Sequence, residues 1–184
     1  MSRAMVEQAI GGDRAAFVAL ATGAYDRLFG VARLILRDDD RAADATQEAL
    51  TAAWLHVRAV RDPDRFDAWL YRLTVHASYR EAARRRHRSM EIDVAPIDVA
   101  DERDAAAEVV AKDQIERAFR RLSAQQRAVL VAHHYLELSD GEAAAVLGIP
   151  VGTMKSRLNR ATQALRAAIE ADDRPTRSMT EVAV

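Results

Sequence analysis

Cysteine is missing from this 184-residue chain, which excludes disulfide bonds and thiolate metal sites. Glycine and proline are scarce, at seven and four residues, while alanine, arginine and leucine are plentiful and runs of β-branched residues are lacking. This composition predicts an almost all-helical protein, and a hydrophobic fraction of 49% is enough to build helical cores. The length allows one ordinary domain or two small ones.

Several functional classes are disfavoured by what the sequence lacks. It has no uninterrupted early apolar run like that of a signal peptide or membrane span, so we expect a cytoplasmic protein without membrane insertion. It has no phosphate-binding glycine loop and no nucleophile–base motif, so neither an enzyme nor a cofactor is expected. The adjacent His133 and His134 point to different helix faces, and no other cluster has metal-ligand spacing, so no metal site is expected.

Charge is unevenly placed, although the formal net charge is only −1. Residues 80–88 read REAARRRHR, whereas residues 91–104 are mostly acidic. Local fields matter more than the sum, so the pattern predicts weak DNA affinity for the chain alone and help from a partner. The acidic stretch has no helical period and indicates a flexible linker that leaves the two halves untethered. The predicted division is a domain over 1–88, a linker over 89–103, a domain over 104–171 and a disordered tail over 172–184.

Apolar residues recur at helical spacing on both sides of this linker. Asp13 suits the N-cap of a long helix, and Asp62 before Pro63 suits the start of another. Ser123 and Gln126 have the spacing of a capping box at the start of a helix in the second half. The predicted helices of the first half span residues 3–10, 14–36, 41–57 and 67–88.

Two polar features lie on the predicted helices of the first half. Asp44, Gln47 and Glu48 share one side of a helix. Such a patch is usually solvated surface, with a binding interface as the alternative. Arg72, His76 and Arg80 stand four apart in the next helix and form a stripe that further arginines continue. These arginines either complement the helix dipole or contact phosphates and unstacked bases, and the pattern alone leaves both open.

The stretch Ser139–Ala168 predicts two helices joined by a tight turn. Glu142 completes a capping box at the start, and Gly148 and Pro150 end the first helix. A new helix begins near Thr153, with basic and polar residues outside its apolar stripe. The pattern is that of a helix-turn-helix whose second helix lies in a DNA major groove, and an ordinary helical hairpin is the alternative. The stripe consists of Met154, Leu158, Ala161 and Leu165.

The turn identifies a family. GIPVGTMKSRLNRATQALR closely resembles the C-terminal helix-turn-helix of bacterial RNA polymerase sigma factors of the extracytoplasmic-function (ECF) group. AADATQEALTAAW and FDAWLYRLTVHASYREAARRRHR resemble two adjoining segments of the same family, so the resemblance covers about Asp13 to Ala168. It implies a sigma factor that directs core polymerase to specific promoters and assists strand opening.

The resemblance also implies partners for three sets of residues. Asp44, Gln47 and Glu48 would bind the clamp coiled coil of the largest polymerase subunit. An anti-sigma protein would be a further partner, as in many relatives. The implied residues for the minus-ten element are Arg61, Phe66, His76, Arg80, Arg84, Arg85 and Arg86, and those for the minus-thirty-five element are Thr153, Lys155, Ser156, Arg157 and Arg160.

The sequence departs from the family at two positions, and two other function classes stay open. His76 stands where the family usually has Asn, and Arg80 where it usually has Asp, so no base preference carries over. An ordinary two-domain DNA-binding regulator explains the C-terminal half equally well, but it does not explain the two N-terminal segments. A protein-binding adaptor without DNA is the other alternative. A regulator should not bind core polymerase, and an adaptor should not confer promoter-specific transcription.

Overall fold

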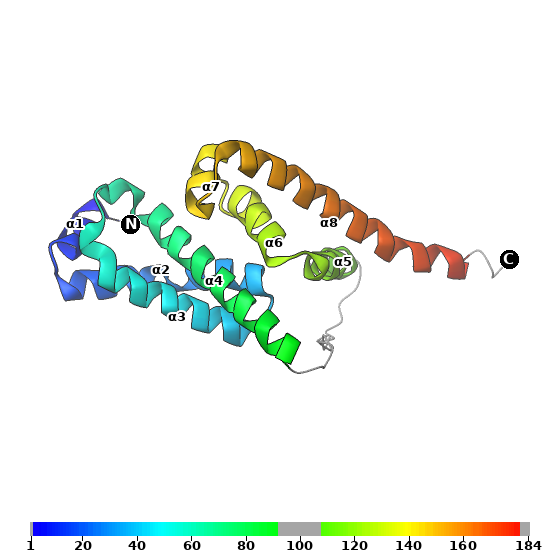
Figure 1. Ribbon diagram of the computed structural model, residues 1–184, viewed down its shortest axis with the longest axis horizontal. Helices are drawn as coiled ribbons and strands as arrows, with labels where there is room; N and C mark the ends of the chain where they lie inside the picture. Colours follow the sequence, from blue (N-terminus) through cyan, green and yellow to red (C-terminus); the bar gives the residue numbers. More distant parts are fainter. Residues whose placement is uncertain (1, 92–107, 181–184) are drawn as a thin grey trace.

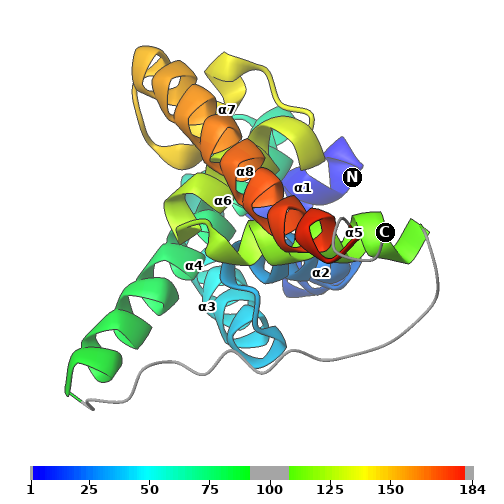
Figure 2. The same ribbon diagram turned by 90° about the vertical axis from the view of Figure 1, so that its right-hand side faces the viewer.

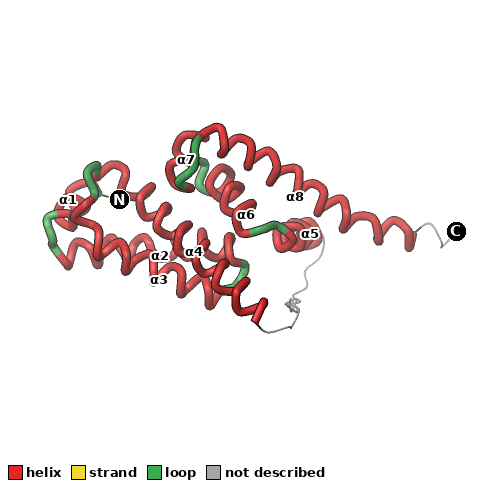
Figure 3. Tube along the Cα trace, viewed as in Figure 1, coloured by secondary structure: helices red, strands yellow, loops and turns green. Residues whose placement is uncertain are grey.

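The structure, a computed structural model, describes residues 2–91 and 108–180. Every regular element among these residues is helical (Figure 3), which confirms the prediction of an all-α protein. The helices before residue 92 are α1 Arg3–Ile10, α2 Arg14–Leu36, α3 Asp39–His56 and α4 Phe66–Glu91, with 3-10 turns at Val57–Ala59 and Pro63–Arg65. The helices after residue 107 are α5 Glu108–Arg121, α6 Ala124–Leu130, α7 Asp140–Leu147 and α8 Val151–Thr180, with a π turn at Val131–Tyr135.

In the N-terminal bundle α2, α3 and α4 pack together, with α1 at one end (Figure 1). Asp13 caps α2 as predicted, because its Oδ1 accepts hydrogen bonds from the backbone N–H groups of Ala15 at 2.8 Å and Ala16 at 3.1 Å. Arg37 ends α2 in the left-handed conformation at φ 58°, and Asp38 caps α3. Small side chains let α3 approach its neighbours closely: Ala42, Ala45, Ala49 and Ala53 are all buried.

By length and composition alone, α2 is apolar enough to cross a membrane. The same properties are typical of a core helix in a globular protein. Leu20 and Leu28 pack in one apolar cluster and Val31 and Ile35 in another, so one side of α2 packs against protein along most of the helix. We therefore interpret α2 as the central core helix of the bundle.

The C-terminal half forms the predicted helix-turn-helix from α7 and α8. Ser123 with Gln126 and Ser139 with Glu142 make the predicted capping boxes. Gly148 ends α7 in the left-handed conformation at φ 68°, which glycine accepts without strain. The helix α8 begins at Val151, slightly before the predicted start. Its predicted stripe is confirmed as well: Met154 and Ala161 are buried, and Leu158 and Leu165 are half-buried.

The two halves share an apolar core, so the prediction that they are untethered is wrong. In the described residues α7 packs on α4, and α6 packs on α2. One cluster joins Ile35 of α2 and Val75 of α4 to Val129 of α6, Val146 of α7 and Met154 of α8. Each half therefore keeps an apolar face that only the other half covers, and burial of these faces holds the halves together.

Two further expectations concern the segments around the helices. The predicted linker over 89–103 lies outside the described residues except for its first three residues, which belong to α4. The predicted disordered tail from residue 172 is wrong as far as Thr180, because α8 continues to that residue. The extension starts at Asp172, whose carboxylate pairs with Arg117 at 3.2 Å and with Arg121, both on α5. Figure 2 shows α8 passing over α6 toward α5.

Candidate functional site

The outer side of α3 carries the three residues predicted to bind core polymerase. Asp44 and Gln47 are exposed and Glu48 is half-buried. A shallow groove along this side is lined by all three together with Leu55, which is 69% exposed. Sequence reasoning missed Leu55, although it follows Glu48 by seven residues and so lies on the same side of the helix. The α3 face, defined as Asp44, Gln47, Glu48, Thr51 and Leu55, combines acidic, amide and apolar groups.

Trp54 borders this face from the other flank of α3. Its ring lies 5.0 Å from that of Phe17 by centroids, yet the residue is 41% exposed. A second shallow groove runs between Trp54 and Tyr25 and is also lined by Gln47 and Leu50. Trp54 is therefore only partly packed against the bundle, and much of its surface faces solvent.

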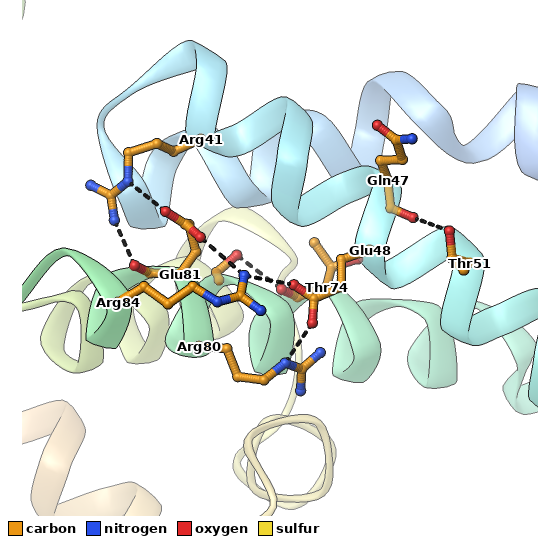
Figure 4. A network of polar contacts seen from close by, with 9 residues as sticks. Arg41, Gln47, Glu48, Thr51, Thr74, Arg80, Glu81 and Arg84 are labelled. Atoms are coloured by element: carbon orange, nitrogen blue, oxygen red, sulfur yellow. Dashed lines mark hydrogen bonds and ion pairs between the residues drawn. The ribbon is translucent and has the colours of Figure 1, made fainter. Parts of the chain in front are cut away.

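Glu48 forms ion pairs with two of the arginines predicted to bind DNA (Figure 4). Its Oε1 accepts a hydrogen bond of 2.7 Å from Nε of Arg80, and its Oε2 accepts one of 3.1 Å from Nη1 of Arg84. Burial raises the pKa of the Glu48 carboxyl, but the hydrogen bonds and charges of the two arginines outweigh burial and hold that pKa below its usual value. Glu48, which is predicted to bind core, is therefore paired with Arg80 and Arg84, which are predicted to bind DNA.

A second carboxylate extends the arrangement into the bundle. Glu81 is buried, and its Oε1 accepts a hydrogen bond of 3.2 Å from Nε of Arg41. Its Oε2 accepts one of 3.1 Å from Nη1 of Arg84, so Arg84 is shared between Glu81 and Glu48. We call this arrangement the α3–α4 ion-pair network, which carries two negative and three positive charges (Figure 4). It consists of Arg41, Glu48, Arg80, Glu81 and Arg84.

His76 lies at the contact between the two halves. A Cβ atom added at Gly148 would lie 3.4 Å from its Nε2, so the imidazole is directly beneath the turn of the helix-turn-helix. Nε2 is buried, and none of the described residues forms a hydrogen bond with it. Burial lowers the pKa of His76, and the charges of Arg72 and Arg80 lower it further. The helix α4 therefore presents His76 to the other half of the chain.

Tyr79 marks the same contact one turn later on α4. Burial raises the pKa of its phenol to about 12, and the nearby charge of Arg157 opposes part of that rise. No hydrogen-bond partner for the hydroxyl occurs among the described residues. Because Arg157 belongs to the predicted recognition helix, the surfaces predicted to read the two promoter elements face each other.

The remaining predicted minus-ten residues are dispersed. Arg61 is exposed in the loop before α4, and Arg84 is exposed on α4. Phe66 is only 2% exposed, and its ring lies 5.5 Å from that of Trp69 in the core of the N-terminal bundle. In the chain without DNA the ring of Phe66 is therefore a core residue at the start of α4, and the contact with DNA that the family resemblance implies for it stays a prediction. The side chains of Arg85 and Arg86 lie outside the described part of the chain.

The predicted recognition residues occupy the first three turns of α8. Lys155, Ser156 and Arg160 are exposed, whereas Thr153 and Arg157 are half-buried. Nε of Arg160 donates a hydrogen bond of 3.2 Å to the carbonyl oxygen of Ser156, which holds the guanidinium along the helix. Within residues 2–91 and 108–180, no three histidine, aspartate or glutamate side chains gather as metal ligands.

Comparison with known proteins agrees with this geometry. The Sigma-70 region 2 family matches residues 20–88, and the Sigma-70, region 4 family matches residues 112–165. The ECF RNA polymerase sigma factor SigM of Mycobacterium tuberculosis is 34% identical over 153 residues, which cover 83% of this chain and 76% of that protein. SigL of the same species is 32% identical over 168 residues, which cover 88% of this chain and 95% of SigL.

Solved structures show the same architecture. The structure of CnrH in complex with the cytosolic domain of CnrY is similar at a TM-score of 0.65 and 27% identity, over 92% of this chain and 97% of the other. The sigma factor RpoE in complex with the anti-sigma factor NepR, from Bartonella quintana, matches in fold at a TM-score of 0.66 and 23% identity, over 85% and 98%.

These matches define a sigma-70-type factor built from regions 2 and 4. The chain belongs to the ECF group of RNA polymerase sigma factors, as the resemblance implied. It is a promoter-specific factor for transcription initiation.

Proposed function

We propose that this chain docks on RNA polymerase core through the α3 face. The observation that carries the proposal is an exposed Leu55 in line with Asp44 and Gln47. A large apolar side chain beside polar groups on one solvent-facing helix side is typical of a surface that becomes buried on binding. The acidic groups suit a basic partner surface, and by family resemblance that partner is the clamp coiled coil of the largest subunit.

The same proposal assigns promoter reading to α4 and α8. Arg72, Arg80 and Arg84 form an exposed basic stripe on α4, suited to the phosphates and displaced bases of the minus-ten element. Exposed Lys155, Ser156 and Arg160 suit the edges and backbone of a duplex minus-thirty-five element. Polymerase carries out RNA synthesis in the cytoplasm, and this chain directs it to specific promoters and assists strand opening.

The closed arrangement has a consequence for this function. His76 is covered by the helix-turn-helix, and Arg157 lies near Tyr79, so the halves must separate before both promoter elements can be read. We infer that binding to core polymerase fixes the spacing of the separated halves. An anti-sigma protein, of the kind present in the complex of RpoE with NepR, would act on the same equilibrium.

Run-off transcription with purified core polymerase and genomic promoter fragments tests the proposal. We expect transcription from a restricted set of promoters that depends on this chain, and capture of core by the chain after nuclease treatment. Tight, selective binding of the free chain to one promoter duplex without any capture of core would instead identify an autonomous regulator. Capture of core without promoter-specific transcription would identify an adaptor.

A further inference from the structure

We propose that Glu48 couples core binding to DNA binding, by pairing with Arg80 and Arg84 in the free protein and releasing them when core engages its carboxylate. The inference rests on the proposed function, because it takes α3 as the core-binding surface and α4 as the minus-ten surface. It adds a positioning role for one residue that links the two surfaces. The α3–α4 ion-pair network shows the link directly (Figure 4).

The geometry leaves Glu48 little capacity for a second partner while the pairs are intact. Each carboxylate oxygen already faces one guanidinium, at 2.7 Å for Arg80 and 3.1 Å for Arg84. A cation on core that binds this carboxylate must share it or displace an arginine. The side chain of Glu48 is 32% exposed, so such a cation has access from the solvent side of α3.

The same pairs reduce what α4 offers to DNA. A guanidinium whose N–H groups and charge face a carboxylate attracts phosphate less than a free one. Arg84 is held twice, by Glu48 and by Glu81, whereas Arg80 pairs with Glu48. Loss of Glu48 therefore frees Arg80 more completely than Arg84, and Arg80 is the main group that the pairing masks.

The pairing depends on a basic side chain at position 80. An aspartate there would repel Glu48 instead of pairing with it. Linkage makes the coupling reciprocal: if core binding frees Arg80, then removal of Arg80 leaves Oε1 of Glu48 available to core, while Arg84 still faces Oε2. The reciprocal effect is the distinctive consequence, because an arginine predicted to bind DNA then weakens binding to polymerase.

The experiment measures affinity of the full chain for core polymerase without DNA. Arg80→Gln is expected to tighten binding about threefold or more. Arg72→Gln is the matched control, since Arg72 is exposed on the same helix side two turns earlier and loses the same charge. Equal effects of the two variants, or weaker core binding by Arg80→Gln, would overturn the proposal. Circular dichroism verifies that each variant is folded.

A second measurement uses the free chain and a fluorescein-labelled single-stranded DNA of mixed sequence. Glu48→Gln is expected to raise affinity severalfold through Arg80, and Asp44→Asn, which loses the same charge one turn away, is expected to raise it less. The gain should vanish in the Glu48→Gln, Arg80→Gln double variant relative to Arg80→Gln. Equal gains from Glu48→Gln and Asp44→Asn would overturn the coupling, because net charge would explain them.

Failure of the proposed function gives a different result. If neither Asp44→Asn nor Glu48→Gln changes affinity for core, the α3 face is not the docking surface. If Arg80→Gln and Arg84→Gln together leave single-stranded DNA binding unchanged, α4 is not the minus-ten surface. Coupling alone fails when both surfaces respond to their own variants but Arg80→Gln and Arg72→Gln act alike on core.

Discussion

Arg127 of α6 donates a hydrogen bond of 2.6 Å from its Nε to the carbonyl oxygen of Ile35, in the last turn of α2. The carbonyl groups at the end of a helix have no partner within the helix, so Arg127 satisfies one of them from the other half of the chain. Its Nη1 donates a 2.8 Å hydrogen bond to the carbonyl oxygen of Leu122, just after α5. One side chain thus ties the end of α2 to the C-terminal half.

The first prediction concerns this tie between the halves. Arg127→Met should lower the free energy of unfolding by about 1–3 kcal/mol and widen the distribution of distances between the halves, because charge-assisted hydrogen bonds to carbonyl groups are lost. Chemical denaturation and small-angle X-ray scattering measure the two effects. Gln125→Ala, at an exposed position on the same helix, is the control. Unchanged scattering would mean that the shared apolar core suffices to hold the halves.

The second prediction concerns pH. Burial lowers the pKa of His76 below its usual value of 6.5, and Arg72 and Arg80 of the same helix lower it further. Because only the burial under the other half is lost on opening, the closed form binds a proton less readily than an opened form. The closed form therefore has its full stability above that usual value and loses stability as the pH falls toward the pKa of the buried imidazole. Energy transfer between labels on the two halves should decrease on acidification through this range.

His76→Gln should remove this part of the pH response. His56→Gln, at an exposed position on α3, should leave the response intact. If both variants respond to acid like the parent chain, other groups cause the opening.

The third prediction concerns the apolar part of the α3 face. Leu55→Ser should weaken core binding by roughly tenfold, because burial of a leucine side chain contributes on the order of 1.5–3 kcal/mol. The free energy of unfolding should not change, since Leu55 is 69% exposed in the free chain. Val18→Ser removes a similarly exposed apolar group from α2 and is the control in the same core-binding titration. Equal losses from both substitutions would point to a general effect of surface hydrophobicity.

The fourth prediction concerns the recognition helix. Arg160→Ala should weaken binding of the polymerase complex to duplex minus-thirty-five DNA, because Arg160 is exposed in the part of α8 that we propose lies in the groove. A base contact predicts relaxed specificity by about 1–3 kcal/mol at one position, and a phosphate contact predicts a uniform loss. Arg166→Ala, also exposed but further along α8, controls for charge. Competition binding with single-position variants of the duplex distinguishes the two contacts.

The fifth prediction concerns the end of α8. Removal of residues 172–184 should lower the melting temperature, because Asp172 pairs with Arg117 and Arg121 of α5. Removal of residues 181–184 alone keeps these pairs and serves as the control. Thermal unfolding followed by circular dichroism measures both. A melting temperature unaffected by the longer truncation would restore the interpretation of this segment as a disordered tail.

Helix boundaries and family could be predicted from the sequence because their causes are local. Asp13, Ser123 and Ser139 cap helices through backbone groups two or three residues away, and Gly148 ends a helix through its own φ angle. The apolar stripe of α8 follows from helical periodicity alone. These signals lie within one or two turns of chain, so they are visible without a fold.

The errors arose where distant segments meet. Packing of α4 on the bundle buries the ring of Phe66, for which the family resemblance alone implied a contact with the minus-ten element. The end of α8 carries no local signal for continued helix, and its order depends on arginines of α5 that lie more than fifty residues earlier in the chain, at separations such as the 55 residues between Arg117 and Asp172. Burial and ion pairing of this kind depend on the packing of helices, which a periodic pattern does not specify.

The sequence by itself determined that the chain is helical, that it ends in a helix-turn-helix and that it belongs among the sigma factors, because caps, turns and motifs act over short stretches. Only the tertiary structure decided that Glu48 faces Arg80 and that His76 lies under Gly148. Helical periodicity fixes which side of its own helix a residue occupies, whereas the partner on that side depends on how the helices pack. The links between core binding, DNA binding and the closed form arise from that packing.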